Sequence, residues 1–136
     1  MRYSTLRADD AQKLREAEVL IIDCFGLLSS IYKYGDVAYV GGGFGVGIHN
    51  TVEAAVWNMP VIFGPNNHKF QEAQELKACG GGIEITDADN FSQTMDRFIS
   101  NAEALKTAAD AAGLYVKEHS GATDRLLELL RGAAEK

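Results

Sequence analysis

The residues of this sequence that could do chemistry gather directly after a run of glycines. Five glycines stand among residues 41–47, and the sequence then reads His-Asn-Thr-Val-Glu over 49–53. Asn50 is a favourable N-cap, and Glu53 stands where the carboxylate of a capping box belongs. A carboxylate in this place, beside a glycine turn, could also accept hydrogen bonds from the two hydroxyls of a ribose. The residues alone leave the structural and the ligand-binding interpretations open.

The glycine run is compatible with an anion site and with a tight turn. It fits neither the P-loop pattern nor a dinucleotide-binding pattern that leads directly into a helix. Glycines allow backbone amides to approach an anion, but they also suit a loop that needs positive φ and close strand–helix packing. We therefore expect either a nucleotide cradle or a structural turn at residues 41–47.

Several other residues could add polar groups to such a site. His49 is expected to hydrogen-bond within the loop. His68 and Lys69 could place positive charge beside the Gly64-Pro65 turn, although a solvated helix start also explains them. Gly26 follows another apolar run, and the amides around it could meet a base or a phosphate. The histidines lack metal-ligand spacing and no nucleophile elbow is present, so we expect neither a metal nor a self-contained active site.

The elements that must position these residues follow an alternating pattern. Short apolar runs, each expected to be a buried strand, stand at 19–22, 37–40 and 61–63, and Ile-Glu-Ile at 83–85 is expected to be a further short strand. Helical patterns fall at 27–34, 52–59, 68–79, 87–99, 102–118 and 122–131. This alternation predicts an α/β fold with a parallel, Rossmann-like sheet and helices on both faces. Ligands of such sheets bind beyond the carboxyl ends of the strands, so the glycine run is expected at a ligand-binding edge.

Composition restricts the partners of the chain. Its 136 residues suit a single domain, with 46% hydrophobic and 24% charged residues. The net charge of −6 and the scattered Lys and Arg argue against nucleic acid as a partner. Cys24 and Cys79 form no C-x-x-C motif and are expected to be reduced thiols of a cytoplasmic protein. No apolar run suits a transmembrane helix or a signal peptide.

Three motifs together resemble one protein family. The sequences DVAYVGGGF at 36–44, GIHNTVEAA at 47–55 and PVIFGP at 60–65 occur in the order and at the spacing of the C-terminal domain of the 3-deoxy-D-manno-octulosonic acid (Kdo) transferases. The resemblance extends from about residue 19 to residue 130. It implies the C-terminal half of a GT-B fold, in truncated form. It also implies a glycosyltransferase of lipopolysaccharide biosynthesis, which moves Kdo from CMP-Kdo to a lipid A precursor.

The resemblance implies a set of donor-binding residues as well. The Asn-x-x-Glu motif of the family falls on residues 50–53, and its strand-end tripeptide falls on 25–27, where Leu27 replaces an acidic residue. The implied nucleotide-binding residues are Phe25, Gly26, Leu27, Asn50, Thr51, Val52 and Glu53. The implied rim around the donor sugar or phosphate comprises Gly43, His49, His68 and Lys69. Metal-independent transfer without a cofactor is expected.

In this family the catalytic carboxylate, the lipid-acceptor surface and the membrane association belong to an N-terminal domain. Residues 1–136 are therefore expected to be a fragment of the donor-binding domain, inactive alone, of an enzyme at the cytoplasmic face of the bacterial inner membrane. Surfaces uncovered by truncation could support dimerisation. Two alternatives stay open. One is another GT-B glycosyltransferase or a sugar-nucleotide epimerase, and the other is a non-catalytic α/β binding domain.

Overall fold

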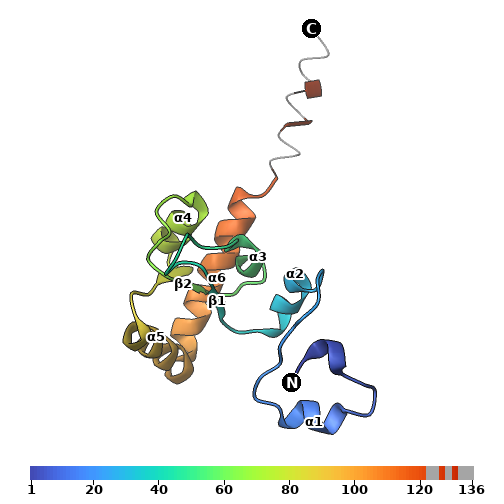
Figure 1. Cartoon of the computed structure of the whole chain (residues 1–136). Coiled ribbons are helices and arrows are strands. Elements are labelled where there is room, and N and C mark those ends of the chain that lie inside the picture. Colours follow the sequence, from blue (N-terminus) through green and yellow to red (C-terminus); the bar gives the residue numbers. More distant parts are fainter. Residues whose placement is uncertain (122–125, 128–129, 132–136) are drawn as a thin grey trace. The chain divides into compact units, whose positions relative to one another are not determined.

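The computed structural model describes residues 1–121, 126–127 and 130–131 (Figure 1). The chain divides into two compact units, Met1–Ile31 and Tyr32–Lys136. The elements of the first unit are η1 (Tyr3–Thr5), α1 (Ala11–Glu16) and α2 (Leu28–Ile31). The elements of the second unit are η2 (Tyr32–Tyr34), β1 (Ala38–Val40), α3 (Val52–Ala55), β2 (Val61–Phe63), α4 (Gln71–Cys79), β3 (Gly82–Glu84), α5 (Ala88–Ser100) and α6 (Ala102–His119).

The strands of the second unit form a parallel sheet in the order β1-β2-β3. Ala38 of β1 lies opposite Val61 of β2, which in turn lies opposite Gly82 of β3. Each strand has only three residues, and all residues of β2 are buried. The predicted strands at 37–40, 61–63 and 83–85 are therefore confirmed, with shifts of one residue at their ends.

Helices cover both faces of this sheet, as the alternating pattern predicts. Val61 and Phe63 belong to a buried cluster with residues of α3, α4 and the second half of α6. Ile62, which points to the opposite face, packs in a second cluster with residues of α5 and the first half of α6. Figure 1 shows α4 and α5 on opposite sides of the strands, with α6 running past both. The α/β class with helices on both faces is confirmed.

The predicted strand at Val19–Ile22 is wrong. Ile21 makes only an isolated parallel bridge with Arg2, in which its N–H donates to the carbonyl oxygen of Met1 at 2.8 Å. Val19 is 65% exposed. An apolar run becomes a buried strand only when neighbouring strands pair with it, and within the unit Met1–Ile31 its backbone partners are the first residues of the chain.

Two predicted helices are shorter than their apolar patterns suggest. The helix expected over 52–59 ends at Ala55, and Asn58 then adopts a left-handed conformation with φ of 53°. The helix expected over 68–79 begins only at Gln71, and it ends as predicted at Gly80, whose φ is 86°. In both cases a hydrogen-bonded turn replaces part of the predicted helix.

The C-terminal part of the chain is described only in part. The predicted last helix, 122–131, lies largely outside the described residues. Within the described part of the chain, no helix is long and apolar enough to cross a membrane. The same residues contain no group of three or more His, Cys, Asp or Glu side chains that could hold a metal ion.

Candidate functional site

The glycine loop after β1 folds back on itself and packs against the turn after β2. Gly42 and Gly47 have positive φ values of 91° and 136°. A Cβ atom on Gly43 would stand 2.6 Å from the Cα and N atoms of Gly64, a distance that no side chain tolerates. The N–H of Asn66 donates to the carbonyl oxygen of Gly43 at 2.8 Å. The glycines therefore let two loops at the carboxyl edge of the sheet touch through their backbones.

Asn50 organises the chain that leaves this loop. Its Oδ1 accepts a hydrogen bond of 3.0 Å from the N–H of Val52, the first residue of α3, whereas Thr51, and not Asn50 as predicted, occupies the N-cap position. Its Nδ2 donates to Oε1 of Glu53 at 3.1 Å. Glu53 thus binds the side chain of Asn50, whereas in a capping box the carboxylate accepts from the backbone N–H of the N-cap residue. The pair holds one carboxylate oxygen at the start of α3 and leaves acceptor capacity on the other.

A half-polar pocket lies beside Asn50. Its volume is about 310 Å³, and it is lined by Ile48, His49, Asn50, Thr51, Phe70 and Glu72. The first four residues come from the segment between the glycine loop and α3, and the last two come from the start of α4. The ring of Phe70 adjoins Gly47, on which a Cβ would stand 3.0 Å from the ring carbons. The glycine at position 47 therefore makes room for the aromatic wall of the pocket.

The electrostatics of the site are dominated by carboxylates. Glu53 is half-buried, whereas Glu72 is exposed. Burial, and secondly the negative charge of Glu53, raise the pKa of Tyr32 above its usual value. Among the lining residues, only His49 can carry a positive charge. Such a surface presents hydrogen-bond acceptors to the hydroxyl groups of a ligand, together with an aromatic ring for its apolar side.

The structure brings only some of the predicted site residues together. His49, Asn50 and Thr51 line the pocket, and Glu53 joins it through its hydrogen bond to Asn50. Val52 is half-buried at the beginning of α3. Gly43 is buried against Gly64, so its role in the fold is packing between loops. His68 and Lys69 are exposed in the turn before α4 and do not line the pocket.

The predicted tripeptide at 25–27 belongs to the unit Met1–Ile31. Phe25 is fully exposed there, and Leu27 is half-buried. Gly26 has a φ of 84°, and a Cβ on it would meet nothing within 4 Å. The positive φ explains the glycine at this turn without a ligand, and the binding role of these residues stays a prediction.

Sequence reasoning missed Phe70 and Glu72. Their helical spacing assigned Phe70 to the apolar face of a longer helix, and Glu72 had no assigned role. A usable signal was present, because both residues follow the turn after β2. The carboxyl ends of β1 and β2 meet at one edge of the sheet, so the segments after them are neighbours in space.

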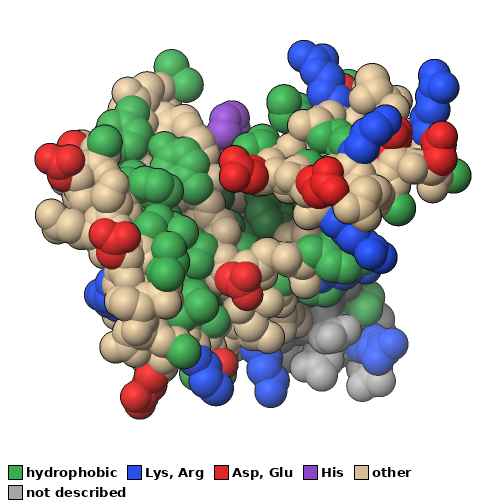
Figure 2. Space-filling view, turned by 90° about the horizontal axis from the view of Figure 1, so that it is seen from below, with side chains coloured by type: hydrophobic (Ala, Val, Ile, Leu, Met, Phe, Trp, Pro, Cys, Tyr) green, Lys and Arg blue, Asp and Glu red, His purple; other side chains and the backbone are tan. Residues whose placement is uncertain are grey.

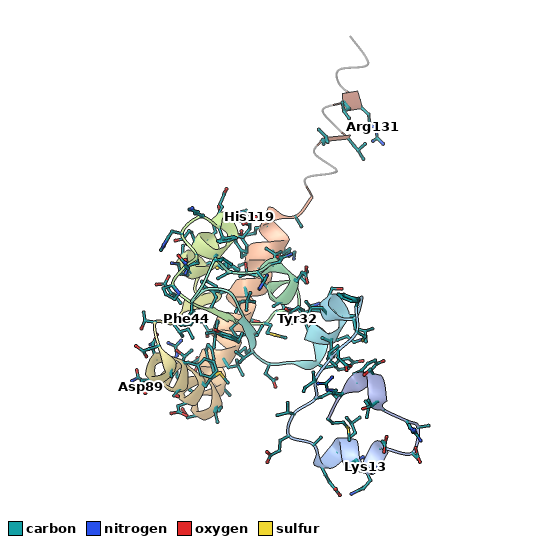
Figure 3. All side chains as sticks on the ribbon, viewed as in Figure 1. Lys13, Tyr32, Phe44, Asp89, His119 and Arg131 are labelled. Carbon is teal, nitrogen blue, oxygen red and sulfur yellow. The ribbon has the colours of Figure 1, made fainter. Side chains whose placement is uncertain are left out.

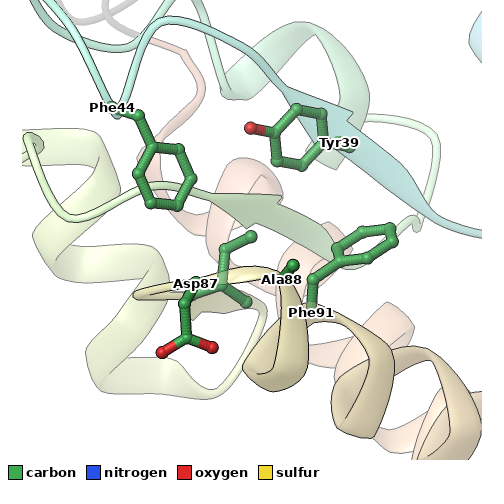
Figure 4. A pocket seen from close by; sticks show the side chains of 6 residues that line it. Tyr39, Phe44, Asp87, Ala88 and Phe91 are labelled. Atoms are coloured by element: carbon green, nitrogen blue, oxygen red, sulfur yellow. The ribbon is translucent and has the colours of Figure 1, made fainter.

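A second pocket, of about 400 Å³, lies on the face of the sheet that α5 covers (Figure 4). Carbon atoms of Tyr39, Phe44, Ile85, Ala88 and Phe91 form its walls, together with Asp87. Figure 4 shows the carboxylate of Asp87 turned away from the three rings. This carboxylate accepts a hydrogen bond of 2.7 Å from the N–H of Asn90 and so caps α5. The half-polar pocket is therefore the candidate functional site.

The fold and the site define the class of this chain as an α/β domain with a polar pocket at the carboxyl edge of a parallel sheet. No protein-family model matches it. The chain is 32% identical over 122 residues to the 3-deoxy-D-manno-octulosonic acid transferase of Aquifex aeolicus, which covers 86% of this chain and 33% of the relative. It is 31% identical over 116 residues to the corresponding transferase of Chlamydia pneumoniae, with 83% of this chain and 26% of the relative covered.

A solved structure agrees with these sequence matches. The C-terminal CMP-Kdo binding domain of WaaA from Acinetobacter baumannii superimposes with a TM-score of 0.67 and 25% sequence identity, over 74% of this chain and 53% of that chain. The chain is thus related to the Kdo transferases and has the fold of their C-terminal domain, which confirms the resemblance of the motifs. It spans about a third of the length of the Aquifex relative and less of the Chlamydia relative.

Proposed function

We propose that this chain is the donor-binding part of a Kdo transferase and holds CMP-Kdo at the edge of its sheet. The observation that carries the proposal is the hydrogen-bonded pair of Asn50 and Glu53 beside the half-polar pocket. The relationship to the Kdo transferases, and to a domain described as binding CMP-Kdo, supports the choice of ligand.

The proposed roles follow the chemistry of the side chains. Glu53 accepts hydrogen bonds from the ribose hydroxyls, and Asn50 keeps its carboxylate in place. Thr51 is 3% exposed and supports the turn that carries Asn50. His49 faces the acidic groups of the donor from the pocket wall. The chain positions the donor, and the proposal assigns no catalytic group to it.

The proposal for the whole protein extends beyond this chain. It is a glycosyltransferase of lipopolysaccharide biosynthesis that moves Kdo to a lipid A precursor, without metal, at the cytoplasmic face of the inner membrane. Its catalytic carboxylate and acceptor surface lie in an N-terminal domain. The names of the related transferases support the reaction class.

Pairing of two copies is a further part of the proposal. β1 is an edge of the described sheet, and Tyr39 on it is 49% exposed. Figure 2 shows hydrophobic side chains gathered over part of one face, with acidic side chains around them. Exposed edges and apolar surface favour association. Light scattering at high protein concentration is expected to detect a dimer, and a strictly monomeric chain would contradict this part.

Nucleotide titration followed by NMR tests the main proposal. CMP is expected to shift the amide signals of Asn50 and Glu53, with smaller shifts from UMP and UDP. Stronger shifts with uridine nucleotides would favour another GT-B glycosyltransferase or an epimerase. The absence of shifts with every nucleotide would favour a binding domain without this ligand. Glu103→Gln, an exposed carboxylate in the first turn of α6, serves as the control variant.

A further inference from the structure

We propose that Phe70 and Glu72 form the subsite for the sugar of the donor, an inference that rests on the proposed function. Both residues stand at the start of α4 and form the wall of the half-polar pocket that faces His49 and Asn50. The two walls belong to segments that follow neighbouring strands. A ligand whose nucleotide is held by the Asn50–Glu53 pair therefore extends its next group toward Phe70 and Glu72.

Phe70 supplies an apolar platform. It is 36% exposed, and its backbone N–H donates to the carbonyl oxygen of Asn67 at 3.0 Å, which anchors the residue at the beginning of α4. The ring lies against Gly47, on which a Cβ would stand 3.0 Å from the ring carbons. An aromatic ring at the wall of a polar pocket suits the C–H groups on one face of a pyranose ring.

Glu72 supplies the acceptor for sugar hydroxyls. Three other glutamates of this unit are engaged: Glu53 binds Asn50, Glu75 binds Tyr115, and Glu84 binds Lys77. Among the described residues, Glu72 has no hydrogen-bond or ion-pair partner, and it lines the pocket. A carboxylate with both oxygens available can accept charge-assisted hydrogen bonds from two neighbouring hydroxyl groups.

The arrangement favours a sugar that carries both hydroxyl groups and an acidic group. Glu72 repels an acid placed beside it, while His49 on the other wall offers the single side chain of the lining that can become positive. An acidic sugar can therefore direct its carboxylate toward His49 and its hydroxyls toward Glu72. A neutral sugar would contact only the wall that carries Glu72.

Comparison of two ligands separates the subsite from the nucleotide site. Calorimetry measures the Kd of CMP and of CMP-Kdo for the chain and for Phe70→Leu and Glu72→Gln. Each variant is expected to raise the Kd of CMP-Kdo roughly tenfold, the effect of about 1.4 kcal/mol, and to change the Kd of CMP less than about twofold. Phe91→Leu and Glu103→Gln are the matched controls, because they alter a phenylalanine of the second pocket and a first-turn carboxylate, both outside the half-polar pocket.

Each outcome decides the inference. A selective loss of CMP-Kdo affinity supports it. Equal losses for both ligands would assign Phe70 and Glu72 to the nucleotide and overturn it, as would variants that behave like the controls. In both cases the proposed function would stand. If the unaltered chain binds neither ligand, the proposed function and the subsite fall together. Amide NMR spectra of the variants confirm that each one keeps its fold.

Discussion

The hydroxyl group of Tyr115 on α6 donates a hydrogen bond of 2.6 Å to Oε2 of Glu75 on α4. This contact joins two helices that are 40 residues apart at this point of the sequence. The ring of His119 lies 4.4 Å from the ring of Tyr115, at the end of α6 that Figure 3 labels. The hydrogen bond from Tyr115, followed by one from Gln71, lowers the pKa of Glu75, and burial raises the pKa of Tyr115.

The Tyr115–Glu75 contact predicts a pH dependence of stability. The folded state lowers the pKa of Glu75, so its contribution is present above the ordinary carboxyl pKa of 4.5 and is lost as the pH falls through the folded value. The raised pKa of Tyr115 acts at alkaline pH, where the free energy of unfolding declines as the pH rises above about 10. Urea unfolding from pH 3 to 7 is expected to show a shallower acid decline for Tyr115→Phe. Tyr34→Phe, exposed in η2, should keep the original slope.

Asn67 is expected to be a principal support of the turn after β2. It is fully buried, and its Nδ2 donates to the carbonyl oxygen of Gly64 at 2.9 Å and to Oε2 of Glu84 at 2.8 Å. Its Oδ1 accepts from Nε2 of Gln74 at 2.6 Å. Asn67→Ala removes these hydrogen bonds, leaves the buried carbonyl oxygen of Gly64 without its side-chain donor, and should lower the free energy of unfolding by about 2 kcal/mol in urea. An unchanged urea midpoint would contradict this role.

Two glycines of the same loop should respond differently to alanine. Gly43→Ala forces a Cβ to within 2.6 Å of the backbone of Gly64, so the two loops must separate. A loss of roughly 2–3 kcal/mol in the free energy of unfolding is expected. Gly41→Ala is the matched control, because a Cβ there meets nothing within 4 Å. Equal stability of the two variants would show that the loop contact contributes nothing.

Asn50→Asp should separate the hydrogen bond that Asn50 accepts from α3 from its part in ligand binding. The aspartate keeps an oxygen that can accept from the N–H of Val52. The free energy of unfolding, measured by thermal unfolding, should therefore change by less than about 1 kcal/mol. It removes the Nδ2 donor to Glu53 and places two carboxylates side by side. The affinity for CMP is therefore expected to fall at least about tenfold. CMP binding as tight as that of the original chain would contradict the proposed role of the pair.

Local patterns in the sequence determined which segments of this protein form strands and helices. The short strand patterns at 37–40, 61–63 and 83–85 and the helical periods between them predict the parallel sheet and its two layers of helices. Asn50 accepts the hydrogen bond of a nearby helical amide that its position at the start of α3 allows, because such a bond joins residues only two or three positions apart. The order and spacing of three motifs also identified the family to which the chain is related.

Contacts between distant segments were decided only by the tertiary structure. The run at 19–22 is as apolar as the true strands, but a strand also requires neighbours, and the first residues of the chain are its only strand partner in its unit. The contact of Gly43 with Gly64 joins two loops that are distant in the sequence, and a role of the glycine loop as a nucleotide cradle stays a prediction. Phe70 and Glu72 join the pocket of Asn50 because parallel pairing brings the ends of β1 and β2 to one edge. Capping and periodicity involve residues a few positions apart, whereas the pocket depends on packing between segments about 20 residues apart.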